Sequence, residues 1–329
     1  WAVRQGLAEV RIVQMQPGER RWGDDADELT PPARDALAAL GEDFAGELLG
    51  FRPHVVGFRV EAGGFDDVRR FVSAVRACCD AEVVLGGPTA TSHPREVLEQ
   101  TGADYVFAGE AEEPFNLFLR LAQRPNARDR LAEIPGLAYR YGGRTFYNAA
   151  CCGRTWPLAP AEVVRANRLD WSLLRHFRRE FDSLFFTGGR GCPGSCAFCA
   201  QLHGRQVRVK PAEQLLAEIA EADARVRSGE LRVARFEHFK HCGDPASRQR
   251  RAAWAAVYDE DFFLDRRRAL EFFRLWSESP LRASYRLSVQ TNPTTLLEGG
   301  KVPAELLEWI VRVQPMIQLG AESFHPELL

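Results

Sequence analysis

Short strand-like runs alternate with helix-like segments along most of the chain, and this alternation restricts the possible folds more than any single motif. Residues 54–58, 82–85 and 104–107 are apolar runs of strand length. Between the first two, residues 66–77 carry apolar side chains at helical spacing. Parallel strands joined by covering helices produce this pattern. We therefore predict an α/β fold in which residues 1–122 form a doubly wound, Rossmann-like domain.

The alternation returns in the second half of the chain. We expect strands at residues 183–187, 254–258, 285–290 and 316–320, with helices that begin near Lys210, Asp265 and Pro303. Residues 181–329 are thus predicted to form a second domain, a series of βα units. Residues 123–180 differ in character and are predicted to be a linker. Gly142-Gly143 between two β-rich runs predicts a hairpin within it.

The composition limits the class of protein. With 329 residues, 45% of them apolar and 27% charged, the chain is long enough for two globular domains. The net charge of −2 gives no reason to expect nucleic acid as a partner. No apolar run approaches the roughly 20 residues of a membrane span, and no signal peptide is visible. Because the chain starts at Trp1 and stops at Leu329 inside a helix-like start, we expect a fragment of a longer protein.

Eight cysteines are present, but they lack the spacing of a secreted, disulfide-rich framework. Adjacent pairs such as Cys78-Cys79 and Cys151-Cys152 favour a reducing compartment, so the expected localisation is cytoplasmic. The pair at 151–152 has no third partner nearby and is expected to be structural.

Three cysteines form a compact group in a loop rich in glycine and proline, directly after an apolar run. They are Cys192, Cys196 and Cys199, in a C-x3-C-x2-C spacing. Three such thiolates can bind three irons of a 4Fe–4S cluster and leave the fourth iron open. Zinc is the alternative, but a structural zinc ion takes four ligands, usually as two close pairs. No second pair is visible, although a fourth ligand could come from His238, His241 or Cys242. The spacing therefore favours the iron–sulfur cluster.

The stretch Arg190–Cys199 resembles the signature of the radical S-adenosylmethionine (SAM) enzymes, in which the open iron chelates SAM. Later segments are similar to other recurrent features of that family. They are an acidic D-(D/E)-x-F stretch at Asp259–Phe262 and a G-x-E-S stretch at Gly320–Ser323. The resemblance implies SAM contacts from Phe198, Asp259, Asp261, Gln290, Glu322 and Ser323. Among the three acids of the first stretch, we favour Asp259 and Asp261 over Glu260. The family barrel has six βα units, so residues 181–329 are expected to form a partial (β/α)6 TIM-barrel-like domain that is truncated at its C-terminus.

Two glycine-containing stretches at strand ends resemble the cobalamin-binding domain that precedes many radical SAM domains. They run from Val83 to Pro94 and from Asp104 to Glu112. The resemblance implies cobalamin contacts from Gly57, Gly86, Gly87, Pro88, Thr89, Gly109 and Glu110. The D-x-H-x-x-G motif of other cobalamin proteins is absent, which argues against a histidine ligand to cobalt. The first strand of the family's domain is expected to lie upstream of Trp1.

Together the resemblances imply a cobalamin-dependent radical SAM enzyme. Such an enzyme reductively cleaves SAM at a 4Fe–4S cluster to a 5′-deoxyadenosyl radical. The expected outcome is methylation of an unactivated carbon in a small-molecule or natural-product substrate, with flavodoxin or ferredoxin as electron donor. Two alternatives stay open: a radical SAM enzyme of another outcome, cyclisation or rearrangement, without functional cobalamin, and a non-catalytic, metal-stabilised binding module.

Overall fold

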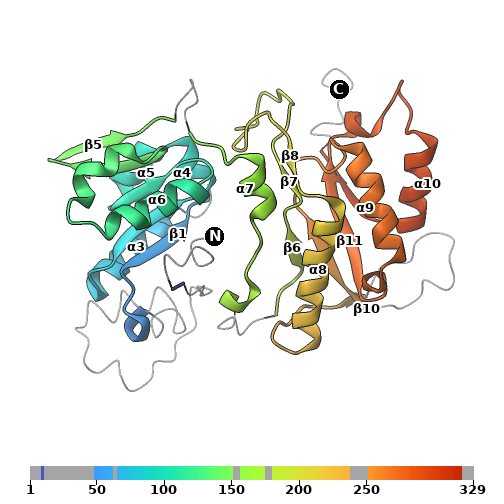
Figure 1. Ribbon diagram of the computed structural model, residues 1–329, viewed down its shortest axis with the longest axis horizontal. Helices are drawn as coiled ribbons and strands as arrows, with labels where there is room; N and C mark the ends of the chain where they lie inside the picture. Colours follow the sequence, from blue (N-terminus) through green and yellow to red (C-terminus); the bar gives the residue numbers. More distant parts are fainter. Residues whose placement is uncertain are drawn as a thin grey trace. The chain divides into compact units, whose positions relative to one another are not determined.

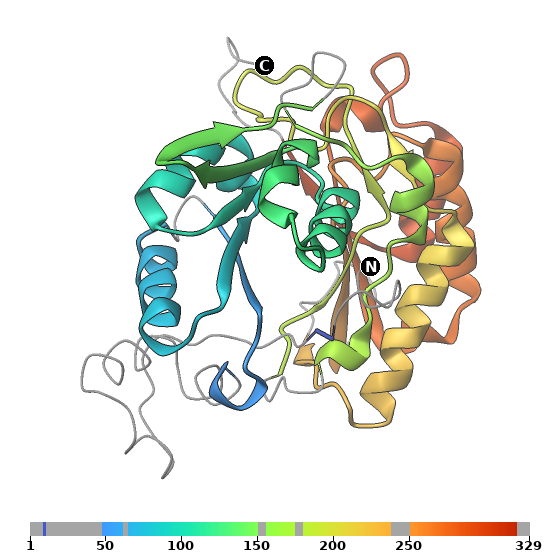
Figure 2. The same cartoon turned by 60° about the vertical axis from the view of Figure 1, so that its left-hand side comes forward.

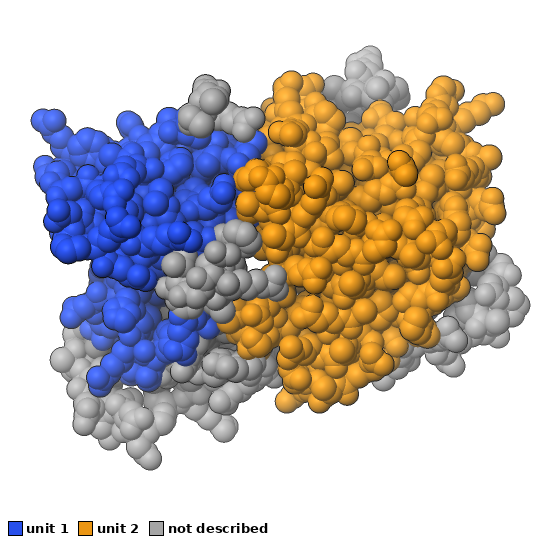
Figure 3. All heavy atoms as spheres, in the orientation of Figure 1, with its two compact units in different colours: residues 1–159 blue, residues 160–329 orange. Residues whose placement is uncertain are grey.

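The computed structural model describes residues 9–10, 48–61, 65–150, 156–174, 180–237 and 251–320. The chain forms two compact units, residues 1–159 and 160–329 (Figure 3).

Unit 1 contains a mixed five-stranded sheet. Its parallel strands are β1 (Val55–Arg59), β2 (Glu82–Gly86) and β3 (Tyr105–Phe107). The antiparallel hairpin β4 (Leu137–Tyr141) and β5 (Arg144–Tyr147) continues the sheet, so the strand order is β1-β2-β3-β4-β5 (Figure 1). The hairpin that was predicted to lie in the linker therefore extends this sheet. Gly142 and Gly143 both have positive φ, as its tight turn requires.

Helices cover both faces of this sheet because successive strand residues point to opposite sides. Val83 and Leu85 of β2 pack with α3 (Phe65–Cys78) and α5 (Pro94–Thr101). Val84 faces the other side, where it packs with Phe118 of α6 (Glu112–Ala122). The short helix α4 (Pro88–Ser92) and the turn η3 (Ala127–Glu133) complete the unit. Burial on both faces agrees with the predicted doubly wound architecture.

Unit 2 contains the four strands expected from the sequence. They are β6 (Leu184–Phe186), β10 (Arg251–Val257), β11 (Tyr285–Thr291) and β12 (Met316–Leu319), all parallel and paired in chain order. Helices α8 (Ala212–Arg227), α9 (Arg266–Glu278) and α10 (Ala304–Val313) connect them and lie on one side of the sheet (Figures 1 and 2). Parallel neighbours in chain order with helices on one side are the winding of a βα barrel.

Shorter elements complete unit 2. The two-residue strands β7 (Gly189–Arg190) and β8 (Arg208–Val209) pair with each other, and β9 (Phe236–Glu237) pairs with β10. Helix α7 (Ala161–Ala166) and the turns η4 (Trp171–Leu174), η6 (Pro280–Ala283) and η7 (Pro293–Leu296) lie between longer elements. As predicted, Asp265 caps α9, because its side chain accepts a hydrogen bond from Arg268 N at 3.0 Å. Within the described ranges, no helix has the length and apolar character needed to cross a membrane.

Candidate functional site

A cleft of about 560 Å³ lies at the carboxyl ends of the parallel strands of unit 2. Its lining includes six residues that the sequence analysis assigned to the cluster or to SAM: Cys192, Cys196, Phe198, Cys199, Asp261 and Gln290. The residues of the cysteine loop follow β7, Asp261 follows β10, and Gln290 belongs to β11. The structure thus brings together side chains that are up to 98 positions apart in the sequence. In βα barrels the active site usually lies at this end of the strands.

The cysteine loop is closed at its base by the pairing of β7 with β8. We call the residues that follow β7 the first arm of the loop and the residues that lead into β8 the second arm. Cys192 N donates a hydrogen bond to Gly204 O at 3.0 Å and so joins the two arms just beyond the strand pairing. Gly191 has a φ of 92°, and a Cβ at this position would overlap the carbonyl oxygen of Gln206. Only glycine therefore allows the two arms to approach this closely.

Backbone amides within the loop point at the cysteine sulfurs. Gly194 N lies 3.4 Å from Cys192 Sγ, and Gln201 N lies 3.4 Å from Cys199 Sγ. Such donors stabilise a thiolate and are among the features that set the potential of an iron–sulfur cluster. Gly194 lies between two sulfurs, because a Cβ there would be 3.3 Å from Cys192 Sγ and 3.9 Å from Cys196 Sγ.

The donor set of the loop fits an iron–sulfur cluster. Three thiolates, two of them with amide donors, can bind three irons of a 4Fe–4S cluster and leave one iron without a cysteine ligand. Among the described residues, no three His, Cys, Asp or Glu side chains are grouped closely enough to hold a single metal ion. The residues named as alternative zinc ligands, His238, His241 and Cys242, lie outside the described residues, as does the pair Cys151-Cys152.

Three consecutive acids follow β10, and the structure corrects the expected place of the first. Asp259 is 3% exposed and is not among the cleft-lining residues. Its Oδ1 accepts hydrogen bonds from Gly188 N and Gly189 N, both at 2.7 Å. Its Oδ2 lies 2.8 Å from Arg268 Nη1. Because Asp259 is buried and does not line the cleft, it is not retained as a SAM contact.

Asp261 lines the cleft but is also extensively hydrogen-bonded. Its Oδ1 accepts from Phe263 N and from the hydroxyl of Thr291. Its Oδ2 accepts from Asn292 N at 3.3 Å and from the hydroxyl of Thr295 at 2.6 Å. This carboxylate therefore ties the turn after β11 to the loop after β10.

Glu260 is the acid with a carboxylate that is open to the cleft. Its side chain is 32% exposed, and Oε1 lies 3.7 Å from Nε2 of His203. Its Oε2 accepts a hydrogen bond from Gly191 N at 3.1 Å. Burial raises the pKa of Glu260, and this effect outweighs the opposing influence of His203. Strand parity could not identify Glu260, since β10 ends at Val257 and the alternation does not extend into the loop.

The remaining predicted SAM contacts divide into two groups. Phe198 lines the cleft with 70% of its surface exposed, and Gln290 Nε2 donates to Asp259 O at 2.7 Å. Glu322 and Ser323 lie outside the described residues. His203 and Gln318 also line the cleft and were not singled out from the sequence, because neither belongs to a recognisable motif.

The glycine stretches of unit 1 meet at the carboxyl ends of β2 and β3, as expected. Thr91 joins them, because its hydroxyl donates to Gly87 O at 2.9 Å and accepts from Gly109 N at 3.0 Å. A Cβ at Gly86 would lie 3.8 Å from Phe107 O, its nearest neighbour, which is an ordinary van der Waals distance. Pro88 and Thr89 begin α4 beside it, and Gly57 is exposed on β1. Thr91 was missed in the sequence, where it is one of several threonines in a polar run.

Two of the expected cobalamin contacts are engaged by the protein's own chain. A Cβ at Gly109 would lie 2.5 Å from Pro157 O and 2.9 Å from the side chain of Trp156. Glu110 is 4% exposed, and its Oε2 accepts a hydrogen bond from Ala159 N at 2.7 Å. Glu110 N also donates to Pro157 O at 3.0 Å. The residues Gly109 and Glu110 therefore hold the segment 156–159, a contact between distant positions that no local sequence pattern indicates.

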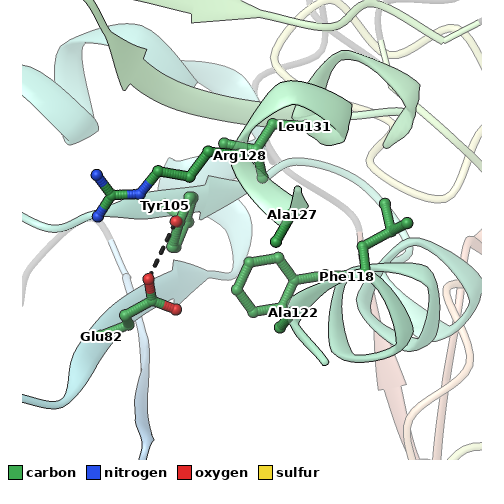
Figure 4. A pocket seen from close by; sticks show the side chains of 8 residues that line it. Glu82, Tyr105, Phe118, Ala122, Ala127, Arg128 and Leu131 are labelled. Carbon is green, nitrogen blue, oxygen red and sulfur yellow. Dashed lines mark hydrogen bonds between the residues drawn. The ribbon is translucent and has the colours of Figure 1, made fainter. Parts of the chain in front are cut away.

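A smaller cavity of about 130 Å³ lies between β2, β3, α6 and η3 of unit 1 (Figure 4). Phe118, Leu121 and Leu131 form its apolar wall, and Tyr105 donates a hydrogen bond to Glu82 at its edge. Burial raises the pKa of Tyr105, and the negative charge of Glu82 adds to the shift. None of the predicted site residues lines this cavity.

Comparison with known proteins agrees with both halves of this description. Residues 24–119 match the family model of the B12 binding domain. No curated protein matches the chain.

Solved structures resemble the chain over most of its length. The radical SAM methyltransferase TsrM from Kitasatospora setae, solved with tryptophan substrate and a SAM analogue, is 16% identical with a TM-score of 0.59. That match covers 84% of this chain and 50% of TsrM. TsrM with cobalamin and a [4Fe–4S] cluster also gives 16% and 0.59, covering 92% of this chain and 58% of TsrM. The cobalamin-dependent SAM radical enzyme OxsB, with aqua-cobalamin and SAM bound, is 16% identical with a TM-score of 0.59, covering 87% of this chain and 38% of OxsB.

The chain thus spans less than two thirds of each of these enzymes. The matches confirm the fold class and the resemblance that the motifs predicted. Residues 24–119 are thus similar to B12-binding domains, and the chain has the α/β fold of solved cobalamin-dependent radical SAM enzymes.

Proposed function

We propose that this protein is a cobalamin-dependent radical SAM enzyme that methylates an unactivated carbon of a small-molecule substrate. The observation that carries the proposal is the cleft of unit 2, where Cys192, Cys196 and Cys199 lie with Glu260 and Gln290 at the strand ends. Its volume, about 560 Å³, is within the usual range for small-molecule sites. When bound, the cluster would supply an electron for the cleavage of SAM and methylcobalamin would supply the methyl group.

The residues of the cleft have distinct proposed roles. The three cysteines hold the cluster, and the amides of Gly194 and Gln201 stabilise two of the thiolates. Glu260 offers a carboxylate to the ammonium group of SAM, in place of the Asp259 favoured from the sequence. We retain Asp261, Gln290 and Phe198 as proposed SAM contacts because all three line the same cleft.

Unit 1 supplies the proposed cobalamin site. Gly86, Gly87, Pro88 and Thr89 lie together at the end of β2, and the two glycines, which lack side chains, let a bulky group approach the backbone. Gly57 remains a proposed contact because it is exposed on the neighbouring strand. We propose flavodoxin or ferredoxin as electron donor and the cytoplasm as compartment, because the cluster needs a reductant and is sensitive to oxygen.

Anaerobic reconstitution tests the proposal. The full chain is loaded with iron, sulfide and hydroxocobalamin, iron and cobalt are counted, and SAM cleavage is followed through 5′-deoxyadenosine and S-adenosylhomocysteine. We expect both metals and both products. Iron without cobalt would favour the alternative of a radical SAM enzyme without functional cobalamin. Zinc alone, or no SAM cleavage by a fully loaded protein, would refute the enzyme proposal.

A triple variant provides the matched control. Cys192→Ala, Cys196→Ala and Cys199→Ala together are expected to abolish iron binding while cobalt binding persists, because the glycine stretches belong to the other unit. Loss of cobalt together with iron would contradict the assignment of the two cofactors to separate units.

A further inference from the structure

A buried ion pair contacts the backbone at the start of β7, the strand that leads into the cysteine loop. Asp259 Oδ2 and Arg268 Nη1 are 2.8 Å apart, and the two side chains are 4% and 5% exposed. Asp259 lies in the loop after β10, and Arg268 lies in the first turn of α9. Removing two charges from water is costly, so a pair this deeply buried is weak evidence of a net gain in stability. Its hydrogen bonds suggest a different use.

The pair holds both arms of the cysteine loop at their base. Asp259 Oδ1 accepts from the amides of Gly188 and Gly189, which precede the first cysteine by only a few residues. Arg268 Nε donates to Lys210 O at 2.9 Å, and Lys210 N donates to Gly188 O at 2.7 Å. Lys210 directly follows β8, the strand that closes the second arm. One ion pair therefore fixes where both arms leave the sheet.

Gly188 leaves room for this pair, because a Cβ there would overlap Nη2 of Arg268. At Gly189 a Cβ would instead lie 2.8 Å from Cγ1 of Val209 in β8. In the described part of the chain, Arg268 Nη2 is buried without a hydrogen-bond partner. Such an unpaired donor costs stability. The arrangement thus favours the position of the loop at some expense to stability.

Glu260, the acid next to Asp259, also binds the backbone of the first arm, and it lines the cleft. Glu260 Oε2 accepts from Gly191 N at 3.1 Å, one residue before Cys192. Adjacent carboxylates therefore bind the amides of Gly188, Gly189 and Gly191 in turn. A shift of Asp259 would move the first cluster ligand relative to the carboxylate that faces the cleft.

We propose that Asp259, held by Arg268, is a positioning residue that sets the cysteine loop relative to Glu260. The proposal rests on the proposed function, since it takes the loop to hold the cluster. Residues of this kind behave like the partners that orient metal ligands, whose loss typically weakens metal binding about 10- to 100-fold.

The test uses Asp259→Asn in the full chain after anaerobic reconstitution. Asparagine has the same shape but lacks the charge and places an amide against either the glycine amides or Arg268. We expect a reconstituted cluster that loses iron to a chelator about 10-fold faster than wild type. We also expect an altered electron paramagnetic resonance spectrum of the reduced cluster when SAM is added. Arg268→Gln should act in the same direction.

Glu218→Gln is the matched control. Glu218 Oε2 and Lys210 Nζ form a second buried ion pair, 2.8 Å long, with side chains 8% and 6% exposed. The side chains of this pair touch none of the three glycine amides, and Lys210 contacts Gly188 and Arg268 only through its backbone. Loss of the pair should therefore lower thermal stability while leaving the cluster spectrum and the rate of iron loss unchanged. Circular dichroism at the assay temperature verifies that each variant is folded.

The outcomes are distinguishable. If wild type retains its cluster and Asp259→Asn matches it in iron loss and spectrum, the positioning role is overturned while the proposed function stands. If Glu218→Gln loses iron as fast as Asp259→Asn, the effect is general destabilisation and the positioning role is again overturned. If wild type takes up no cluster, the proposed function fails and this proposal fails with it.

Discussion

Replacing Glu260 by glutamine gives the sharpest test of how the cleft would bind SAM. The substitution keeps the size of the side chain and an oxygen that can accept from Gly191 N, so the loop contact at 3.1 Å can persist. It removes the negative charge that we assign to the ammonium group of SAM. Asp261 cannot easily compensate, because its two oxygens already accept hydrogen bonds from four donors.

The expected magnitude follows from the environment of the carboxylate. A hydrogen bond to a charged group contributes about 1.5–3 kcal/mol. Glu260 is 32% exposed, so solvent screening moves the value to the lower end of this range. A loss of about 1.4 kcal/mol is a factor of ten in the dissociation constant. We therefore expect Glu260→Gln to weaken SAM binding about tenfold.

Anaerobic equilibrium dialysis with radiolabelled SAM measures this effect on protein of known iron content. Glu271→Gln is the control, because Glu271 is a half-buried acid on α9 that pairs with Arg274 and lies outside the cleft. Equal SAM affinity in wild type and Glu260→Gln, at equal iron content, would refute the assignment. A loss of iron in Glu260→Gln would instead show that its contact with Gly191 supports the loop.

The raised pKa of Glu260 determines how SAM affinity should change with pH. Protonation neutralises Glu260, so SAM affinity should fall as the pH falls through this pKa, and Glu260→Gln should flatten that dependence. The stability of the protein without SAM should change with pH in the opposite direction to SAM affinity. Because the pKa is higher in the folded state, the contribution of Glu260 to stability should decrease as the pH rises from the ordinary glutamate value through the raised one.

Three further predictions concern the loop and unit 1. Gly191→Ala should destabilise unit 2 by at least about 2 kcal/mol in denaturant titrations, since it combines a positive φ with overlap of the Gln206 carbonyl; an unchanged midpoint would contradict the close approach of the two arms. Gly194→Val should leave the apoprotein folded but lower iron uptake on reconstitution, because its side chain would enter the space beside two sulfurs; full iron loading would show that the cluster lies elsewhere. Glu110→Ala should leave Ala159 N without its buried acceptor and cost about 1–3 kcal/mol; hydrogen exchange at residues 156–159 should accelerate, and unchanged protection there would disprove the contact.

The strands were predictable because their sequence patterns are local. Residues 83–85 are apolar on both faces, and residues 285–290 alternate apolar with polar side chains, so each pattern is a property of the segment itself. The cysteine loop was predictable for a similar reason, since its three ligands lie within eight residues. The choice among the acids was not, because the direction of Asp259 depends on Arg268 and on two glycine amides about 70 positions upstream. Glu110 likewise meets a partner 49 positions away.

The chain-order pairing of strands has a consequence for how the protein folds. Among the described strands, β1 to β5 pair in sequence, and β6, β10, β11 and β12 do the same in unit 2. Each strand can therefore join a sheet edge that is already present, and none must wait for a partner made much later in synthesis. By the time residue 268 has been made, the cysteine loop, its closing strand β8, the three acids after β10 and Arg268 all exist. We expect the loop to take its cluster-binding form on the nascent chain, before β11 and β12 are added.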